Sequence, residues 1–142
     1  MGRLVALHHS YGVFSTEELK EINKLGDSLE LKEGAVLVDG EDSVEHKKRN
    51  TKIAWVHNIS STAWIFRRMS KLWQLEPISM LQAFQYSVYN VDGHYDWHRD
   101  SFMEPDKDGK IRKLSVTVNL NDDFEGGDMY FDNEIDYGKT KP

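Results

Sequence analysis

Two side chains able to bind a metal stand two residues apart in the segment YNVDGHYDWHRDSF, residues 89–102. In an extended chain, residues i and i+2 project to the same side, so His98 and Asp100 would present an imidazole nitrogen and a carboxylate oxygen together, with Arg99 pointing the opposite way. These are two of the three ligands of the facial triad in non-haem Fe(II) oxygenases, which leaves coordination positions open. The pair alone is a weak signal, because a solvated turn in which a histidine pairs with a carboxylate carries the same residue types.

The composition limits the class of protein. The chain has 142 residues, a net charge of −6, 39% hydrophobic residues and no cysteine, so it fits one globular domain that would hold a metal through nitrogen and oxygen. The acidic balance argues against nucleic acid as the main partner, and the basic cluster at residues 47–50 is too short to reverse it. No apolar run approaches membrane-spanning length and residues 1–12 are too polar for a signal peptide, so we expect a cytoplasmic protein.

The first element expected is a helix over residues 15–26. Ser15 and Glu18 have the spacing of a capping box, and the residues at the two staple positions are Phe14 and Leu19. The helix would end at Gly26. One apolar stripe would face the core, formed by Leu19, Ile22 and Leu25.

A second helix is expected over residues 61–75, closed by Pro77. Its apolar face would carry Ile65, Met69 and Leu72. Short apolar runs at 35–38 and 53–56 predict two strands on either side of a charged loop.

The later part of the chain has the pattern of strands. Residues 81–91 predict an extended run in which Ala83, Gln85, Ser87 and Tyr89 share one face, and Phe84, Tyr86 and Val88 share the other. Residues 111–120 alternate more strictly and predict a second strand, and residues 128–131 a short third one. Helices followed by strands indicate an α+β fold, with the helices packed on one side of an antiparallel sheet or barrel.

Three ordered motifs point to a family. The motifs are Y-x-x-x-G-x-Y-x-x-H-x-D at 89–100, KLSVTVNLN at 113–121 and FEGGDMYF at 124–131, with weaker matches at 52–56 and in the first helix. In this combination the sequence resembles the 2-oxoglutarate- and Fe(II)-dependent dioxygenases, in the prolyl 4-hydroxylase-like branch with its phage and bacterial relatives. The resemblance covers nearly the whole chain.

The resemblance implies a fold and a reaction. The fold is a distorted double-stranded β-helix, a jelly roll supported by N-terminal helices. Fe(II) would be bound by His98 and Asp100 and chelated by 2-oxoglutarate, with ascorbate as a candidate reductant. Oxidative decarboxylation to succinate and CO₂ would drive hydroxylation of an unactivated C–H bond, with a prolyl or other peptidyl residue of a peptide or protein as the expected substrate.

The resemblance also assigns further site residues. Tyr89 matches a tyrosine that hydrogen-bonds 2-oxoglutarate in this branch, and the substrate side would be formed by Tyr95, Trp97 and Arg99. A packing role stays open for the three aromatic side chains. Gly126 and Gly127 would permit a tight turn.

The family pattern is incomplete in this sequence. A second histidine ligand, and a Lys or Arg for the distal carboxylate of 2-oxoglutarate, belong downstream of the Gly126–Gly127 turn, but no histidine follows His98 in this sequence. We therefore expect residues 1–142 to be a single oxygenase domain that lacks its C-terminal strands and that is inactive on its own. One alternative is that an upstream histidine substitutes, and the candidates are His94 and, less readily placed, His8, His9, His46 and His57. Another is that the chain is a partner-dependent or regulatory fragment that does no chemistry.

Three other functions remain open from the sequence. The same fold would also suit a nucleobase hydroxylase or a small-molecule hydroxylase. A jelly-roll binding fragment with an inert H-x-D pair is the non-enzymatic alternative. The oligomeric state is not readable from the sequence.

Overall fold

The computed structural model describes residues 12–38, 41–72, 82–100, 105–106, 108–112 and 114–130. The elements in chain order are α1 (Thr16–Asp27), β1 (Lys32–Glu33), β2 (Val36–Val38), β3 (Glu41–Ser43), β4 (Arg49–Asn50), β5 (Lys52–Val56), α2 (Ala63–Ser70), β6 (Phe84–Val88) and β7 (His94–Tyr95). The fold is therefore a mixed α+β arrangement, as expected.

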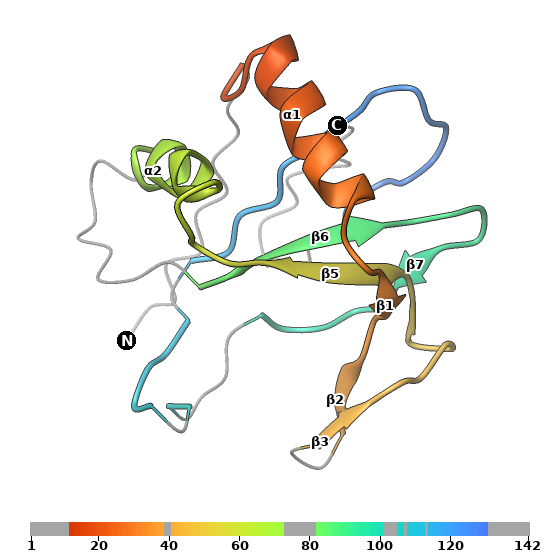
Figure 1. Ribbon diagram of the computed structural model, residues 1–142. Coiled ribbons are helices and arrows are strands. Elements are labelled where there is room, and N and C mark those ends of the chain that lie inside the picture. The colour runs from red at the N-terminus through yellow and green to blue at the C-terminus, as the bar shows by residue number, and fades with distance from the viewer. Residues whose placement is uncertain are drawn as a thin grey trace.

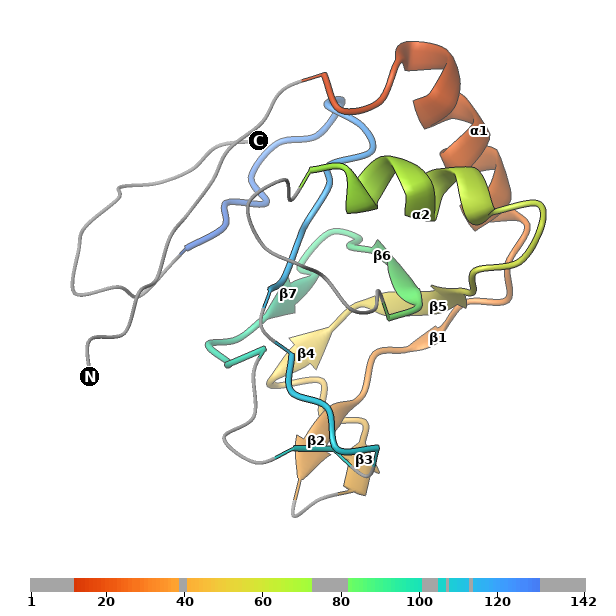
Figure 2. The ribbon, with the colours of Figure 1, turned by 90° about the vertical axis from the view of Figure 1, so that its left-hand side faces the viewer.

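All the strands of the described residues pair in three small antiparallel sheets. One sheet has the order β1-β5-β6, the second joins β2 to β3, and the third joins β4 to β7. The charged loop expected between β2 and β5 therefore contains two further short strands, β3 and β4. The two helices lie on one side of the β5–β6 ladder, and the β2–β3 hairpin projects away from it (Figures 1 and 2). The described residues do not form a complete double-stranded β-helix.

The start of α1 follows from local sequence. The hydroxyl of Ser15 accepts a hydrogen bond from the amide of Glu18 at 3.2 Å, and the Ser15 amide donates to the Glu18 carboxylate at 2.8 Å. These two bonds form the predicted capping box and satisfy amides that the helix leaves unpaired. The hydrogen bond from the Ser15 amide lowers the pKa of Glu18, and Arg68 of α2 lowers it further. The same carboxylate thus links the two helices.

The core lies between the helices and the sheet. Phe14, Ile22, Ile65 and Met69 form its buried cluster, and Leu19 and Leu25 pack against it as predicted. One face of β6 packs against this core. Its Phe84 ring stacks on Phe66 of α2, with ring centroids 4.2 Å apart.

The sequence predicted that α1 would end at Gly26, and this prediction is wrong. The helix runs to Asp27 and is capped by Ser28. A Cβ atom at Gly26 would lie 2.1 Å from the ring of Tyr86 on β6. The glycine therefore lets the helix approach the strand closely. Burial, followed by the charge of Asp27, raises the pKa of the Tyr86 hydroxyl.

Two other expectations need correction. Helix α2 ends at Ser70 and is followed by a turn at residues 71–72, whereas a helix to residue 75 was expected; residues 73–75 and Pro77 lie outside the described residues. Residues 111–120 form no strand among the described residues, because no described segment provides a ladder for them. Only the end of this run is packed, where Val118 and Leu120 contact the helical cluster.

The C-terminal part of the described chain contains a turn with two glycines. Gly126 and Gly127 both adopt positive φ, 76° and 66°, which agrees with a tight turn. Beyond it, Met129 forms a single β-bridge in place of the short strand expected over residues 128–131, of which Phe131 is not described.

Neither described helix is long and apolar enough to cross a membrane.

The contact between Gly26 and Tyr86 generates a prediction. Gly26→Ala should lower the free energy of unfolding by about 1–3 kcal/mol, as overpacking of a tight contact does. At an unobstructed helix position the same change would raise it by roughly 1 kcal/mol. Urea denaturation measures the difference.

Two further variants isolate the cause. Lys20→Ala, at an exposed position of the same helix, should be close to neutral. In a Tyr86→Ala background the added methyl group should become stabilising; a penalty that persists there would show that the ring is not what Gly26 accommodates.

Candidate metal centre

The segment that carries the H-x-D pair is positioned by a two-residue ladder. Arg49 and Asn50 of β4 pair antiparallel with Tyr95 and His94 of β7, and the amide of Asp96 extends the pairing by donating to the Lys48 carbonyl at 2.7 Å. This ladder fixes the chain immediately before the two candidate ligands.

The turn before β7 needs a glycine. Gly93 donates its amide to the Asn90 carbonyl at 2.7 Å, and a Cβ atom at Gly93 would lie 2.7 Å from that same oxygen. Asp92, just before it, has a positive φ of 64°. The tight turn directs the chain from β6 back to β4.

His98 and Asp100 come together as predicted. The Nε2 atom of His98 lies 3.3 Å from Oδ1 of Asp100, and the side chains are 38% and 49% exposed. The segment is not a strand: Trp97 donates its amide to the side chain of Asp96 at 2.8 Å, which marks a bend. The local bend, rather than regular extension, brings the two groups to one side.

The tautomer of His98 follows from the hydrogen bond of its Nδ1 atom. Nδ1 lies 2.8 Å from the carbonyl oxygen of Asp96, an atom that can only accept, so Nδ1 carries the proton and donates it there. In the neutral ring Nε2 then presents a lone pair toward the Asp100 carboxylate. Two acceptors this close repel one another unless a proton or a cation lies between them.

The donor set fits a divalent metal ion. Two ligand atoms about 2.1 Å from a first-row ion, and cis to one another in an octahedron, lie about 3 Å apart. The observed 3.3 Å between Nε2 and Oδ1 is close to that separation. A backbone carbonyl that orients the second nitrogen is also the usual support of a metal-bound histidine.

His94 does not act as an additional ligand in this arrangement. Its Nδ1 lies 3.1 Å from the Asp92 carbonyl oxygen and its Nε2 3.2 Å from the Lys47 carbonyl oxygen. Both nitrogens are therefore used to join the turn to the loop before β4. Within the described part of the chain no group of three His, Asp or Glu side chains could hold a metal, and His8 and His9 lie outside it.

The side chain of Tyr95 lies against the candidate ligand. Its ring stacks on the His98 imidazole, with centroids 3.6 Å apart and planes 9° from parallel. The guanidinium carbon of Arg49 lies 4.4 Å from the centroid of the Tyr95 ring. Tyr95 is thus a direct neighbour of His98, and a role in substrate binding stays a prediction.

The other predicted site residues lie at the surface. Tyr89 is 51% exposed, and Trp97, 66% exposed, lies 6.5 Å from Tyr130 between ring centroids. Burial raises the pKa of the Tyr89 hydroxyl, while the nearby Arg49 and Thr51 oppose this effect. Arg99 is exposed. The structure therefore brings Tyr89 near Arg49, and leaves its predicted contact with 2-oxoglutarate as a prediction.

Two arginines that the sequence analysis did not select support the site. Arg49 is buried beside β6, where one guanidinium nitrogen donates to the Gln85 side chain. Arg112 donates to the carbonyl of Asp100 at 2.9 Å and to the Gln82 side chain at 3.0 Å, so it braces the backbone of the second ligand. One feature of the sequence could have indicated that Arg49 points inward. It alternates with Thr51 and Ile53 on one face of an extended segment.

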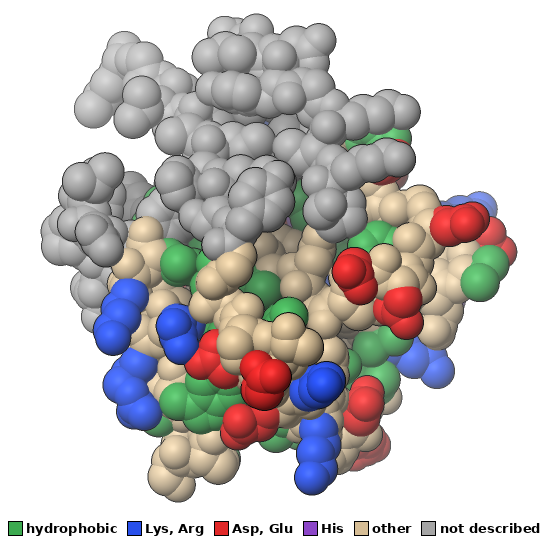
Figure 3. Space-filling view, turned by 90° about the horizontal axis from the view of Figure 1, so that it is seen from above, with side chains coloured by type: hydrophobic (Ala, Val, Ile, Leu, Met, Phe, Trp, Pro, Cys, Tyr) green, Lys and Arg blue, Asp and Glu red, His purple; other side chains and the backbone are tan. Residues whose placement is uncertain are grey.

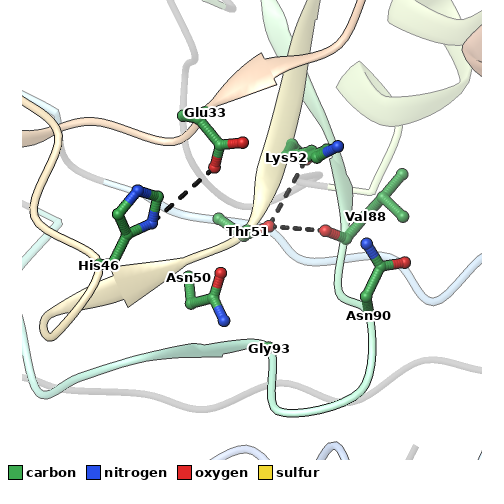
Figure 4. A pocket seen from close by; sticks show the side chains of 8 residues that line it. All are labelled: Glu33, His46, Asn50, Thr51, Lys52, Val88, Asn90 and Gly93. Carbon is green, nitrogen blue, oxygen red and sulfur yellow. Dashed lines mark hydrogen bonds and ion pairs between the residues drawn. The ribbon is translucent and has the colours of Figure 1, made fainter.

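A separate polar cavity of about 130 Å³ lies between β1, the start of β5 and the turn after β6 (Figure 4). Its lining includes Glu33 and His46, whose Oε2 and Nδ1 atoms are 4.0 Å apart, and Lys52. Of the candidate residues named from the sequence, His46 lines this cavity, whereas His98, Asp100, Tyr89, Tyr95, Trp97 and Arg99 do not. The candidate metal site is instead an open surface site.

The bonds of His94 generate a prediction on pH. Two backbone carbonyls, that of Asp92 first and that of Lys47 second, raise the pKa of His94, since only the protonated ring can donate to both. A folded-state pKa above the unfolded value means that this stabilisation is complete below about pH 6.5 and is lost as the pH rises through the folded pKa. The unfolding midpoint of the wild type should therefore be higher than that of His94→Gln, and the difference should be larger at about pH 6 than at about pH 8. An equal difference at both pH values would contradict the double hydrogen bond.

A comparison with known protein families covers the segment that contains the two candidate ligands. A family model described as 2OG-Fe(II) oxygenase superfamily matches residues 84–142, which begin at the first residue of β6 and include His98 and Asp100. No curated protein and no solved structure matches the chain. That superfamily uses Fe(II) and 2-oxoglutarate, and residues 84–142, which make up less than half of this chain, are similar to its domain.

Proposed function

We propose that this protein uses Fe(II), held by His98, Asp100 and a third ligand that the described residues do not supply, together with 2-oxoglutarate to hydroxylate an unactivated C–H bond, with a prolyl or other peptidyl residue as the substrate. The observation that carries the proposal is the pair of ligand atoms 3.3 Å apart, Nε2 and Oδ1, with the remaining histidine nitrogen committed to the Asp96 carbonyl. The family match over the same residues supports it.

The bound iron with 2-oxoglutarate would supply the oxidising power, by coupling decarboxylation to activation of O₂. The chain's own residues have a simpler task. His98 and Asp100 hold two adjacent positions, Asp96 keeps the imidazole in the tautomer that coordinates, and Arg112 fixes the backbone behind the carboxylate. Because both ligands are partly exposed, the opposite side stays accessible to the cosubstrate and substrate.

Exposed aromatic side chains near these ligands support a peptide substrate. Trp97 directly precedes His98, and its ring centroid lies 6.5 Å from that of Tyr130, so an exposed aromatic pair belongs to the same segment as the first ligand. Exposed aromatic rings suit the apolar ring of proline and other apolar side chains. On the helix side of the molecule, basic and acidic side chains lie among one another (Figure 3). The helix side therefore lacks the concentrated positive surface that a nucleic-acid backbone requires, in line with the net charge of −6.

Two protein ligands also determine how the metal should bind. A neutral imidazole and one carboxylate neutralise only half the charge of a divalent ion, and the described residues offer no third side chain. Chelation by 2-oxoglutarate would add two oxygen ligands. We therefore expect Fe(II) to bind weakly alone and more tightly with 2-oxoglutarate.

The test is an anaerobic titration with Fe(II) and then 2-oxoglutarate, followed by the visible charge-transfer absorption of the iron–keto acid chelate. Wild type should develop this absorption and His98→Ala should lose it, since the chelate would no longer be anchored to the protein. His57→Ala removes a different, exposed histidine and should leave it unchanged.

The outcomes separate the candidate functions. Absorption in wild type that survives His98→Ala would place the metal elsewhere and contradict the proposal. No absorption in wild type would favour an inert binding fragment. With the chelate established, succinate formation stimulated by a proline-rich peptide, and not by free nucleobases, would support the peptidyl substrate.

A further inference from the structure

Three flat groups lie in contact beside the proposed metal site. The Arg49 guanidinium carbon is 4.4 Å from the centroid of Tyr95, and the imidazole of His98 is 3.6 Å from that centroid and nearly parallel to the ring. An imidazole this close covers one face of the tyrosine, so the guanidinium must lie over the other face. Tyr95 is thus held between a cation and the candidate ligand.

Pairing between strands produces one half of this stack. Arg49 and Tyr95 are direct partners across the β4–β7 ladder, so their side chains emerge on the same face. The bend at Asp96 and Trp97 produces the other half, because it returns His98 over the ring three residues before it.

Arg49 is itself fixed more firmly than a surface arginine. It is only 6% exposed, it donates to the Ala35 carbonyl at 2.9 Å, and it donates to the Gln85 side chain on β6. Its Nε packs against Gly34, where a Cβ atom would lie 2.6 Å away. The guanidinium is therefore held in one position, with its central carbon over the Tyr95 ring.

Packing alone does not explain an arginine at this position. Nε is buried and has no hydrogen-bond partner among the described residues. A buried N–H without a partner costs stability, and an apolar side chain of similar length would fill the same space without that cost. An apolar residue could reproduce neither the hydrogen bonds to Ala35 and Gln85 nor the charge over the Tyr95 ring, and of these only the charge acts on the ring directly.

We propose that Arg49 is a positioning residue for the metal centre: its guanidinium holds the Tyr95 ring, and the ring holds the plane of the His98 imidazole so that Nε2 faces Asp100. The inference rests on the proposed function for its consequence on metal binding. The stack itself is a property of the metal-free chain. Together with the Asp96 carbonyl, which holds Nδ1, it leaves the imidazole little freedom to rotate.

The first measurement uses the full 142-residue chain without metal. Protons of an imidazole stacked on a tyrosine ring are shifted upfield in the NMR spectrum, so the ring protons of His98 should show this shift in wild type. Arg49→Met and Tyr95→Leu should both remove it. Lys48→Met is the matched control, because this neighbouring cation is paired with Glu45 at 3.0 Å; it should leave the shift intact.

The second measurement titrates the same variants with Co(II), whose visible d–d absorption reports coordination by His98. Arg49→Met should weaken binding about tenfold, the lower end of what loss of an outer partner costs a metal-bound histidine. In a Tyr95→Leu background Arg49→Met should add no further loss, since the arginine acts through the ring. Two additive losses would indicate a general structural effect and overturn the positioning role.

The remaining outcomes are also decisive. An unchanged upfield shift in a folded Arg49→Met variant would overturn the inference, whatever the metal does. Co(II) binding that is His98-dependent in wild type and equally tight in Arg49→Met would overturn it while leaving the proposed function intact. No His98-dependent Co(II) signal in wild type would contradict the proposed function and the metal role of Arg49 together. If Arg49→Met fails to fold, Arg49→Lys serves instead, since it keeps the cation and should retain part of the shift and the affinity.

Discussion

The antiparallel ladder between β5 and β6 is the interaction on which the rest of the structure depends. It pairs five residues of each strand, from Lys52 opposite Val88 to Val56 opposite Phe84. Side chains alternate across such a ladder, so one strand can serve two environments. On one face of β6, Phe84 and Tyr86 support the helices; on the other, Gln85 receives Arg49. The core and the candidate site are thus built on opposite sides of the same strand.

Local sequence was sufficient to predict the parts that local interactions determine. The capping box at Ser15 and Glu18 sets where α1 begins, and alternation correctly divided the side chains of β6 between two faces. The approach of His98 and Asp100 was also predicted, although a bend and not a strand produces it. In each case the determining contacts lie within a few residues of one another.

What the sequence could not predict depends on partners distant along the chain. Strand β4 has only two residues and exists because β7 lies beside it, so Arg49 was read as part of a short basic cluster. Gly26 was read as a helix stop because its true constraint, the ring of Tyr86, comes from a strand sixty residues later. The alternating run at 111–120 has the pattern of a strand, yet a strand also needs a neighbour with free backbone groups, which a periodicity does not report.

The hydrogen bond between the Asn23 side chain and the Leu120 carbonyl has a consequence for the order of folding. It joins α1 to the C-terminal run at 2.9 Å across 97 residues of sequence. Closing so long a loop costs more chain entropy than forming a capped helix or a hairpin, so this contact belongs to the last stage of assembly. Interactions that form after the rate-limiting step mainly control how fast the native state opens. The Asn23 hydrogen bond should therefore slow unfolding more than it speeds folding.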